Sequence, residues 1–112
     1  MIYELRIYTI FPGKIDAIRK RFSDHTLGIF DRLGMEVCDF WEDLEEQPKL
    51  YYTMRYESME ERKRQWEAFS QDQEWNEVKQ KSEQGGKIVE RVEQVFMKRA
   101  DYFSAGYPTI LD

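Results

Sequence analysis

The chain repeats one strand-and-helix unit, and this repeat limits the folds that it can adopt. An alternating, strand-like segment at residues 2–10 and another at residues 49–56 are each followed by a helical pattern of apolar residues. Each unit then leads into a further strand-like segment, near residues 35–44 and 87–98. Two such units in tandem are the plan of a ferredoxin-like α+β domain. The sequence therefore predicts the order βαββαβ, with an antiparallel four-stranded sheet and helices on one face.

Helix signals separate these strands. We expect the first helix from the turn at Pro12-Gly13 to about Leu33, because apolar residues recur there at helical spacing. Its predicted buried stripe consists of Ile15, Ile18, Phe22, Ile29 and Leu33, with His25 at the edge. The second helical region begins at Ser58-Met59-Glu60-Glu61, a capping box in which the last glutamate reaches back to the cap. Asp72 is placed to cap a further short helix.

The first strand carries apolar residues on both faces, because side chains alternate along a strand. One face has Ile2, Glu4, Arg6, Tyr8 and Ile10, and the other has Tyr3, Leu5, Ile7 and Thr9. Helices can cover one face, so the other face needs a different cover. A second copy of the same sheet would supply it, and we therefore expect a homodimer. In the second strand, we expect Val37, Asp39 and Trp41 on one face and Cys38 and Phe40 on the other.

Composition indicates a globular, single-domain protein and argues against a nucleic-acid partner. At 112 residues, with 41% hydrophobic and 35% charged residues, the chain is large enough to bury one core. The net charge is −5, and the basic residues are interleaved with acids on the predicted helices. We interpret the basic residues as solvated helix faces: Lys14, Arg19, Lys20, Arg21, Arg62, Lys63 and Arg64.

Targeting signals are not evident in this sequence. No stretch reaches the roughly 20 consecutive apolar residues that cross a bilayer. No basic and then apolar leader precedes the first strand-like segment, so we expect neither a membrane span nor a secretion signal. Cys38 is the only cysteine, which excludes an internal disulfide. A reducing, cytoplasmic location is the expectation that follows.

An ordered set of short motifs resembles the NIPSNAP family. The motifs are Tyr3-Glu4-Leu5-Arg6-Ile7-Tyr8 with Pro12-Gly13, His25-Thr26-Leu27 with Gly34 and Phe40-Trp41, Tyr52-Thr53-Met54-Arg55-Tyr56-Glu57-Ser58, and Glu61-Arg62 with Trp66, Phe69, Asp72 and Glu74-Trp75. Gln73 departs from the family pattern, which often has proline there, but both residues suit a first helical turn. We expect a NIPSNAP-like domain at residues 1–104 and a C-terminal tail at residues 105–112.

The family is part of the dimeric α/β-barrel superfamily. The resemblance therefore implies two ferredoxin-like protomers whose sheets close on each other. Relatives in this superfamily include cofactor-independent monooxygenases, lactone isomerases, and haem-degrading and chlorite-cleaving enzymes. Likeness at the level of the fold carries little weight for function, so the function has to be argued from a site.

His25 is the candidate catalytic acid or base. It is the only histidine, and histidine is the side chain whose charge changes near neutral pH. In a functional interpretation, it points from the first helix into a pocket against the sheet. In a structural interpretation, it lies at the edge of the buried stripe and is hydrogen-bonded to the backbone or to a carboxylate.

Four further residues are candidate ligand contacts. Arg6 and Arg55 lie within strands, where a permanently charged guanidinium needs a partner. They would bind an anionic ligand with two-pronged contacts, or they would be neutralised inside the fold. The acids available for this are Glu4, Asp39 and Glu57. Tyr8 and Trp41 would be flat walls of a ligand pocket, or they would belong to the core and the dimer interface.

A metal site is not expected from the residue types. One histidine, no cysteine pair and no calcium-loop spacing of acids leave few ligands for a metal ion. We therefore predict no metal and no cofactor, with haem on the single histidine as the open alternative.

Two functions follow from these residues. The first is a homodimer with a small-molecule pocket for an aromatic or apolar ligand with an anionic end, which would be oxidised or exchange a proton without a metal. The second is a non-catalytic protein-interaction module, whose exposed faces or aromatic tail dock another protein. This aromatic tail is the longer segment from Arg99 to Asp112, which includes residues 105–112 and contains Tyr102, Phe103 and Tyr107. The residues name no substrate and do not decide whether the chain is an enzyme.

Overall fold

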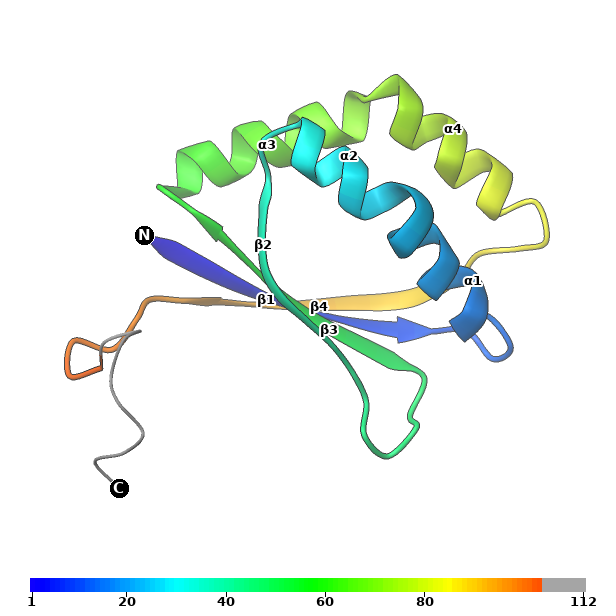
Figure 1. The fold of residues 1–112 in the computed structure, drawn as a ribbon, viewed down its shortest axis with the longest axis horizontal. Helices are drawn as coiled ribbons and strands as arrows, with labels where there is room; N and C mark the ends of the chain where they lie inside the picture. The colour runs from blue at the N-terminus through cyan, green and yellow to red at the C-terminus, as the bar shows by residue number, and fades with distance from the viewer. Residues whose placement is uncertain (104–112) are drawn as a thin grey trace.

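A computed structural model describes residues 1–103 of the chain (Figure 1). Its elements are β1 (Ile2–Ile10), α1 (Ile15–Arg21), η1 (Phe22–Thr26), α2 (Leu27–Arg32), β2 (Glu36–Glu42), β3 (Lys49–Tyr56), α3 (Met59–Gln71), α4 (Gln73–Ser82) and β4 (Val89–Met97). The four-stranded sheet has the order β2-β3-β1-β4, and each neighbouring pair is antiparallel. The helices lie together on one side of this sheet (Figure 1). The predicted ferredoxin-like α+β class is confirmed.

The first helical region is interrupted by a π turn. α1 ends at Arg21, and η1 follows it without a break in the helix. The amide of Leu27 donates to the carbonyl of Phe22, rather than to that of Ser23 as in an α-helix. The π turn therefore adds one residue to the region that we predicted as a single α-helix.

This extra residue changes which side chains face the sheet. The buried residues of the region are Ile18, Arg21, Phe22, Thr26, Ile29 and Phe30. In a straight helix, His25 would follow Phe22 on the same face, because residues three apart are neighbours there. With the π turn, Thr26 takes the inward position and His25 is exposed. The functional interpretation of His25 as a residue that points at the sheet is therefore corrected.

Capping residues begin the helices of the second unit. The hydroxyl of Ser58 accepts a hydrogen bond of 3.1 Å from the amide of Glu61. The carboxylate of Glu61 binds Arg64 instead of reaching back to the cap, so half of the predicted capping box forms. Asp72 caps α4 as predicted, by accepting from the amide of Trp75 at 3.0 Å.

A β-bulge in β2 changes the predicted faces of that strand. Val37 and Asp39 oppose consecutive residues of β3, so Cys38 is the extra residue of the bulge. The extra residue reverses the alternation of side chains beyond it. Val37 consequently faces the helices together with Phe40. Asp39 and Trp41 face away from the helices, and not with Val37 as we predicted.

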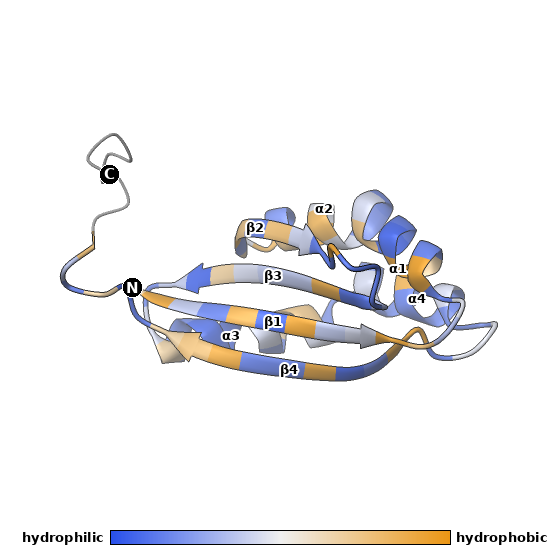
Figure 2. Cartoon of the chain, turned by 90° about the horizontal axis from the view of Figure 1, so that it is seen from below, coloured by the Kyte–Doolittle hydropathy of each residue, from blue (hydrophilic) through white to orange (hydrophobic). Residues whose placement is uncertain are grey.

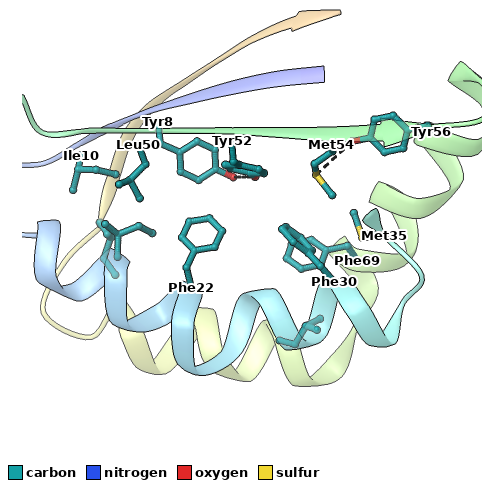
Figure 3. Packing of buried hydrophobic residues seen from close by; sticks show 13 residues of the cluster. Tyr8, Ile10, Phe22, Phe30, Met35, Leu50, Tyr52, Met54, Tyr56 and Phe69 are labelled. Carbon is teal, nitrogen blue, oxygen red and sulfur yellow. Dashed lines mark hydrogen bonds between the residues drawn. The ribbon is translucent and has the colours of Figure 1, made fainter. Parts of the chain in front are cut away.

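The core lies between the sheet and the helices and is rich in aromatic rings (Figure 3). The rings of Phe40 and Tyr52 stack with their centroids 4.9 Å apart, and Phe22 meets both of them edge-on. The buried cluster consists of Tyr8, Ile10, Ile18, Phe22, Ile29, Phe30, Met35, Leu50, Tyr52, Met54, Tyr56, Phe69 and Ile88. Many of the aromatic residues of the sequence therefore serve this core.

Within residues 1–103, no helix covers the opposite side of the sheet. Figure 2 looks onto this side of the sheet. Leu5 and Ile7 are half-buried here, while Val95 and Met97 are 48% and 37% exposed. A contiguous apolar surface of this kind is typical of an interaction surface.

Candidate functional site

The five predicted site residues lie in three separate regions of the structure. Arg6 and Tyr8 are buried on the helix side of β1. Arg55 and Trp41 lie on the uncovered side of the sheet. His25 is exposed on the helix layer. Arg6 and Arg55 occupy matching places in the sequence repeat, but the register of their antiparallel strands puts them on opposite faces. No single pocket in the described chain brings the five side chains together.

Arg6 is engaged by partners within the fold. Its Nε donates to Tyr52 Oη at 2.9 Å, and its two Nη atoms donate to the Glu4 carboxylate at 2.9 Å and to Tyr8 Oη at 3.4 Å. The guanidinium carbon lies 4.2 Å from the centroid of the Trp66 ring. Arg6 is thus neutralised by Glu4, which is one of the two alternatives that the sequence left open.

Glu4 is a fully buried carboxylate that links two arginines. Arg62 donates to it from Nε at 3.2 Å and from Nη2 at 3.0 Å, and the hydroxyl of Tyr56 donates at 2.7 Å. Burial alone raises the pKa of the Glu4 carboxyl. The hydrogen bonds from Arg62 and Tyr56 and the charge of Arg6 outweigh this effect, so the pKa of Glu4 lies below its usual value. The carboxylate is therefore ionised at neutral pH.

Two tyrosine hydroxyls extend this cluster along the sheet. Tyr8 Oη and Tyr52 Oη are 2.8 Å apart, and Figure 3 shows the two rings side by side on neighbouring strands. Burial and the neighbouring Tyr8 raise the pKa of Tyr52 well above its usual value, so its hydroxyl stays protonated. Tyr8 lies at the end of the cluster and also lines a cavity.

This cavity, of about 290 Å³, lies between the sheet and the helices beside the edge strand β4. Tyr8 and Val92 line it from the sheet, whereas Phe22, Thr26 and Trp75 line it from the helix layer. Charged residues also contribute to its lining: Arg21, Lys79, Glu83, Lys87, Glu90 and Arg91. The cavity therefore combines aromatic walls with charged groups.

Arg21 is the buried cation of this cavity. The sequence placed it on a solvated helix face, but it is only 7% exposed. Its Nη1 donates to Ser82 Oγ at 3.2 Å and to the Glu83 carboxylate at 3.4 Å, and its guanidinium carbon lies 5.1 Å from the Trp75 ring centroid. Its Nε is buried and has no hydrogen-bond partner within residues 1–103. Burial lowers the pKa of Arg21 despite the opposing effect of Glu83, yet an arginine remains charged at neutral pH.

His25 borders a second hollow, of about 460 Å³, between the first helical region and α4. Lys20, Glu74, Glu77 and Lys81 are among the other residues that line this groove. His25 has no hydrogen-bond partner in the described part of the chain, so it lacks the contact that the structural interpretation expected. Arg21 lines both the groove and the cavity and thus stands between them.

Arg55 and Trp41 belong to the uncovered face of the sheet. The Nε of Arg55 lies 2.6 Å from the carboxylate of Glu36, an acid that was not among its predicted partners. Trp41 is 47% exposed. Both residues are therefore placed to contact whatever covers this face, and neither reaches the cavity.

Residues 1–103 hold no group of three His, Cys, Asp or Glu side chains that could bind a metal ion. No helix in this part of the chain is long and apolar enough to cross a membrane.

Cys38 is an exposed residue that forms no disulfide within residues 1–103. Partial burial of its thiol and the negative charge of nearby Glu36 raise the pKa of this cysteine. It is therefore a thiol rather than a reactive thiolate at neutral pH. The expectation of no cofactor, and haem as its alternative, stay predictions.

Sequence reasoning missed the residues that complete the polar cluster and the cavity. The five predicted site residues did not include Arg21, Tyr52 or Arg62, although the sequence spacing of Arg21 and of Tyr52 indicates burial. Arg21 follows the buried Ile18 by three residues, which is a same-face helical spacing. Tyr52 alternates with the buried Leu50 along β3.

Comparisons with known proteins identify what this chain resembles. The family model described as NIPSNAP matches residues 3–103. An uncharacterized NIPSNAP domain protein from Burkholderia xenovorans has 24% sequence identity and a TM-score of 0.77, over 93% of this chain and 99% of that one. A NIPSNAP family protein from Agrobacterium tumefaciens has 20% identity and a TM-score of 0.78, over 90% and 94%.

A more distant structure shares the fold alone. A putative antibiotic biosynthesis monooxygenase from Nitrosomonas europaea has 9% identity and a TM-score of 0.62, over 88% of this chain and 98% of that one. Among curated proteins, none matches the sequence.

Proposed function

This chain belongs to the NIPSNAP family, and we propose that it is a homodimer that binds a small aromatic or apolar molecule with an anionic end. The observation that carries the proposal is the cavity of about 290 Å³ between the sheet and the helices. Its aromatic walls suit a flat, apolar molecule, and its buried Arg21 suits a negative charge. Of the residues predicted from the sequence, Tyr8 is the one that lines this cavity.

The chemistry that we propose for a bound molecule is proton transfer at Tyr8. The Tyr8 hydroxyl is hydrogen-bonded to Tyr52 at 2.8 Å and receives a contact from Arg6 at 3.4 Å. Tyr52 and Arg6 would hold the Tyr8 oxygen in place, so the Tyr8 hydroxyl could exchange its proton with a polar atom of the bound molecule. No metal is needed for such a step. His25 lies in the outer groove, so it would not take part in it.

The homodimer is supported by the uncovered face of the sheet. Leu5, Ile7, Val95 and Met97 form an apolar surface there, and exposure to water of such a surface is unfavourable. A second sheet packed face to face would bury it. Trp41 and Arg55 would then lie at this interface rather than in the ligand cavity.

One pair of substitutions on the same strand tests the two parts of the proposal separately. Val92 lines the cavity and Val95 lies on the uncovered face, so Val92→Trp should fill the cavity and Val95→Trp should disturb the dimer. We expect native mass spectrometry to find Val92→Trp dimeric without bound small molecule, and Val95→Trp shifted toward monomer. A monomeric wild-type protein at micromolar concentration would exclude the dimer. Equal ligand binding by wild type and Val92→Trp would exclude the cavity.

A non-catalytic interaction module is the second candidate function. Arg99 donates to Tyr3 Oη at 3.1 Å and so holds the start of the tail against β1. Tyr102 is 91% exposed, whereas residues 104–112, including Tyr107, lie outside the described residues. If the tail docks another protein, removal of residues 99–112 should abolish binding of that partner and leave the dimer intact in sedimentation. Unchanged binding by the truncated chain would exclude this role.

A further inference from the structure

We infer that Arg21 binds the carboxylate of a single-ring aromatic acid, with the ring in the cavity and the charge at its helix side. This inference rests on the proposed ligand cavity and names both the anchoring residue and the class of ligand. Arg21 is 7% exposed, so its charge is largely removed from water. A buried cation of this kind requires compensation by partners.

The partners of Arg21 are incomplete. Nη1 contacts Ser82 at 3.2 Å and Glu83 at 3.4 Å. The distance of 3.4 Å to the Glu83 carboxylate is long for a charge-assisted hydrogen bond. Nε is buried and has no hydrogen-bond partner in residues 1–103. Buried donors are nearly always satisfied in folded proteins, so an unpaired one indicates a missing acceptor. A ligand carboxylate is an acceptor that would complete this set.

The aromatic wall beside Arg21 gives the ligand its orientation. The guanidinium lies over the Trp75 ring, which stacks on Phe69 with the ring centroids 4.6 Å apart. Phe30 follows at 5.0 Å from Phe69, and all three rings line the cavity. A planar acid with its carboxylate at Arg21 would therefore place its ring against this wall, on the side of the cavity that leads to Tyr8.

The π turn is an independent feature of the same wall. It follows Arg21 directly and begins and ends at Phe22 and Thr26, and all three residues are buried and line the cavity. The hydroxyl of Thr26 donates to the carbonyl of Arg21 at 3.2 Å and so fixes the backbone that carries the arginine. π turns inside α-helices are frequently found at functional sites.

Size and charge narrow the ligand class. A void of about 150 Å³ accommodates benzene, so a cavity of about 290 Å³ has room for one substituted ring. Drug-sized ligands occupy pockets of about 300–1,000 Å³, so this cavity suits a small aromatic acid rather than a larger one. Lys79 and Lys87 add positive charge to the lining, whereas Glu83 and Glu90 add negative charge. Arg21 is the cation among them that is shielded from water.

The test compares a carboxylate with its neutral isostere on the full-length protein. Phenylacetate and phenylacetamide have nearly the same shape, and calorimetric titration measures the affinity for each. We expect wild-type protein to bind phenylacetate about tenfold or more tightly than phenylacetamide, because a hydrogen bond to a buried charge is lost in the amide.

Two matched variants test whether Arg21 causes the preference for phenylacetate over phenylacetamide. Arg21→Met should lower the affinity for phenylacetate to that for phenylacetamide while leaving the amide affinity unchanged. Arg19→Met removes an exposed arginine of the same helix, which pairs with Asp16 and Glu42, and should change neither affinity. If Arg21→Met does not fold, NMR spectroscopy of the wild-type protein gives a second test. The Arg21 Nε–H resonance is identified because it is absent from the spectrum of Arg21→Lys. We expect this resonance to shift when phenylacetate is added.

The outcomes separate this inference from the function on which it rests. Binding of acid and amide with equal affinity, or an acid preference that survives in Arg21→Met, would overturn the role of Arg21 while the cavity remains a ligand site. An Arg21 resonance that does not move at saturating phenylacetate would overturn it in the same way. If neither compound binds, or if Val92→Trp binds both as well as wild type does, the cavity itself is not the site and both proposals fail.

Discussion

Arg6 and Arg21 are both buried, but the fold satisfies them to different degrees. Arg6 uses Nε and both Nη atoms, and its carboxylate partner Glu4 is itself completely buried. Arg21 uses one nitrogen, its partner Glu83 is at 3.4 Å, and its Nε has no partner in the described chain. A fully bonded guanidinium stabilises one arrangement of the sheet and α3. A partly bonded one beside a cavity leaves donors for a ligand.

The largest effect is expected where the Arg6 cluster is broken. Glu4→Gln keeps the shape of the side chain but leaves Arg6 and Arg62 without their buried negative partner. We expect the free energy of unfolding to fall by about 3–5 kcal/mol, which urea denaturation would measure. Glu90→Gln, at an exposed position of β4, is the control and should change stability little. A loss as small as that of the control would contradict a structural role for the cluster.

The same cluster should make stability depend on pH. The pKa of Glu4 in the folded protein is lowered from a usual value of 4.5. A lowered folded pKa contributes stability that is present above pH 4.5 and is lost as the pH falls below it, because the unfolded chain then binds the proton first. Thermal unfolding measured from neutral to acidic pH should therefore show a steeper loss for wild type than for Glu4→Gln. Parallel curves for the two proteins would show that other carboxylates, such as Asp72, account for the acid sensitivity.

A much smaller effect on stability is expected at Arg21. Arg21→Met replaces an incompletely bonded buried charge by an apolar side chain of similar length, and Glu83 can turn to solvent. Such replacements are often neutral or stabilising, so we expect the free energy of unfolding to change by no more than about 1 kcal/mol. Urea denaturation next to Glu4→Gln gives the comparison directly. A loss equal to that of Glu4→Gln would mean that both arginines have the same structural role.

The smallest effect is expected at His25. The side chain is exposed and borders the outer groove, so His25→Ala should change the free energy of unfolding by less than about 0.5 kcal/mol. It should also leave the affinity for phenylacetate unchanged, because it does not line the cavity. A drop in affinity for phenylacetate would restore His25 to the ligand site and weaken the assignment of that site to Arg21.

The fold could be predicted because its main signals are local. Ser58 and Asp72 begin helices as predicted, and the alternation in residues 2–10 gives a strand that is buried on one face. The π turn at η1 and the bulge at Cys38 could not be predicted in the same way. Each adds a single residue to a regular period, and the pattern of apolar residues on either side of it stays intact.

The candidate site was harder to predict because it depends on pairing between distant residues. Arg6 and Tyr8 were recognised as polar groups within a strand, and Tyr8 does line the cavity. The grouping of Arg6 with Arg55 failed because the pairing of Arg6 with Tyr52 and of Arg55 with Tyr3 follows from a long-range register. Arg21 was assigned to solvent because it ends a run of basic residues, although it follows the buried Ile18 by three residues on the same face of α1.

The π turn at Phe22–Thr26 also affects how relatives of this chain should be aligned. A relative with an uninterrupted α-helix in this place has one residue fewer between Arg21 and Ile29, so a correct alignment needs a gap inside η1. An alignment without that gap would set His25 against an inward residue of the relative and would shift Thr26 out of its column. The histidine would then be compared with positions that it does not share in space.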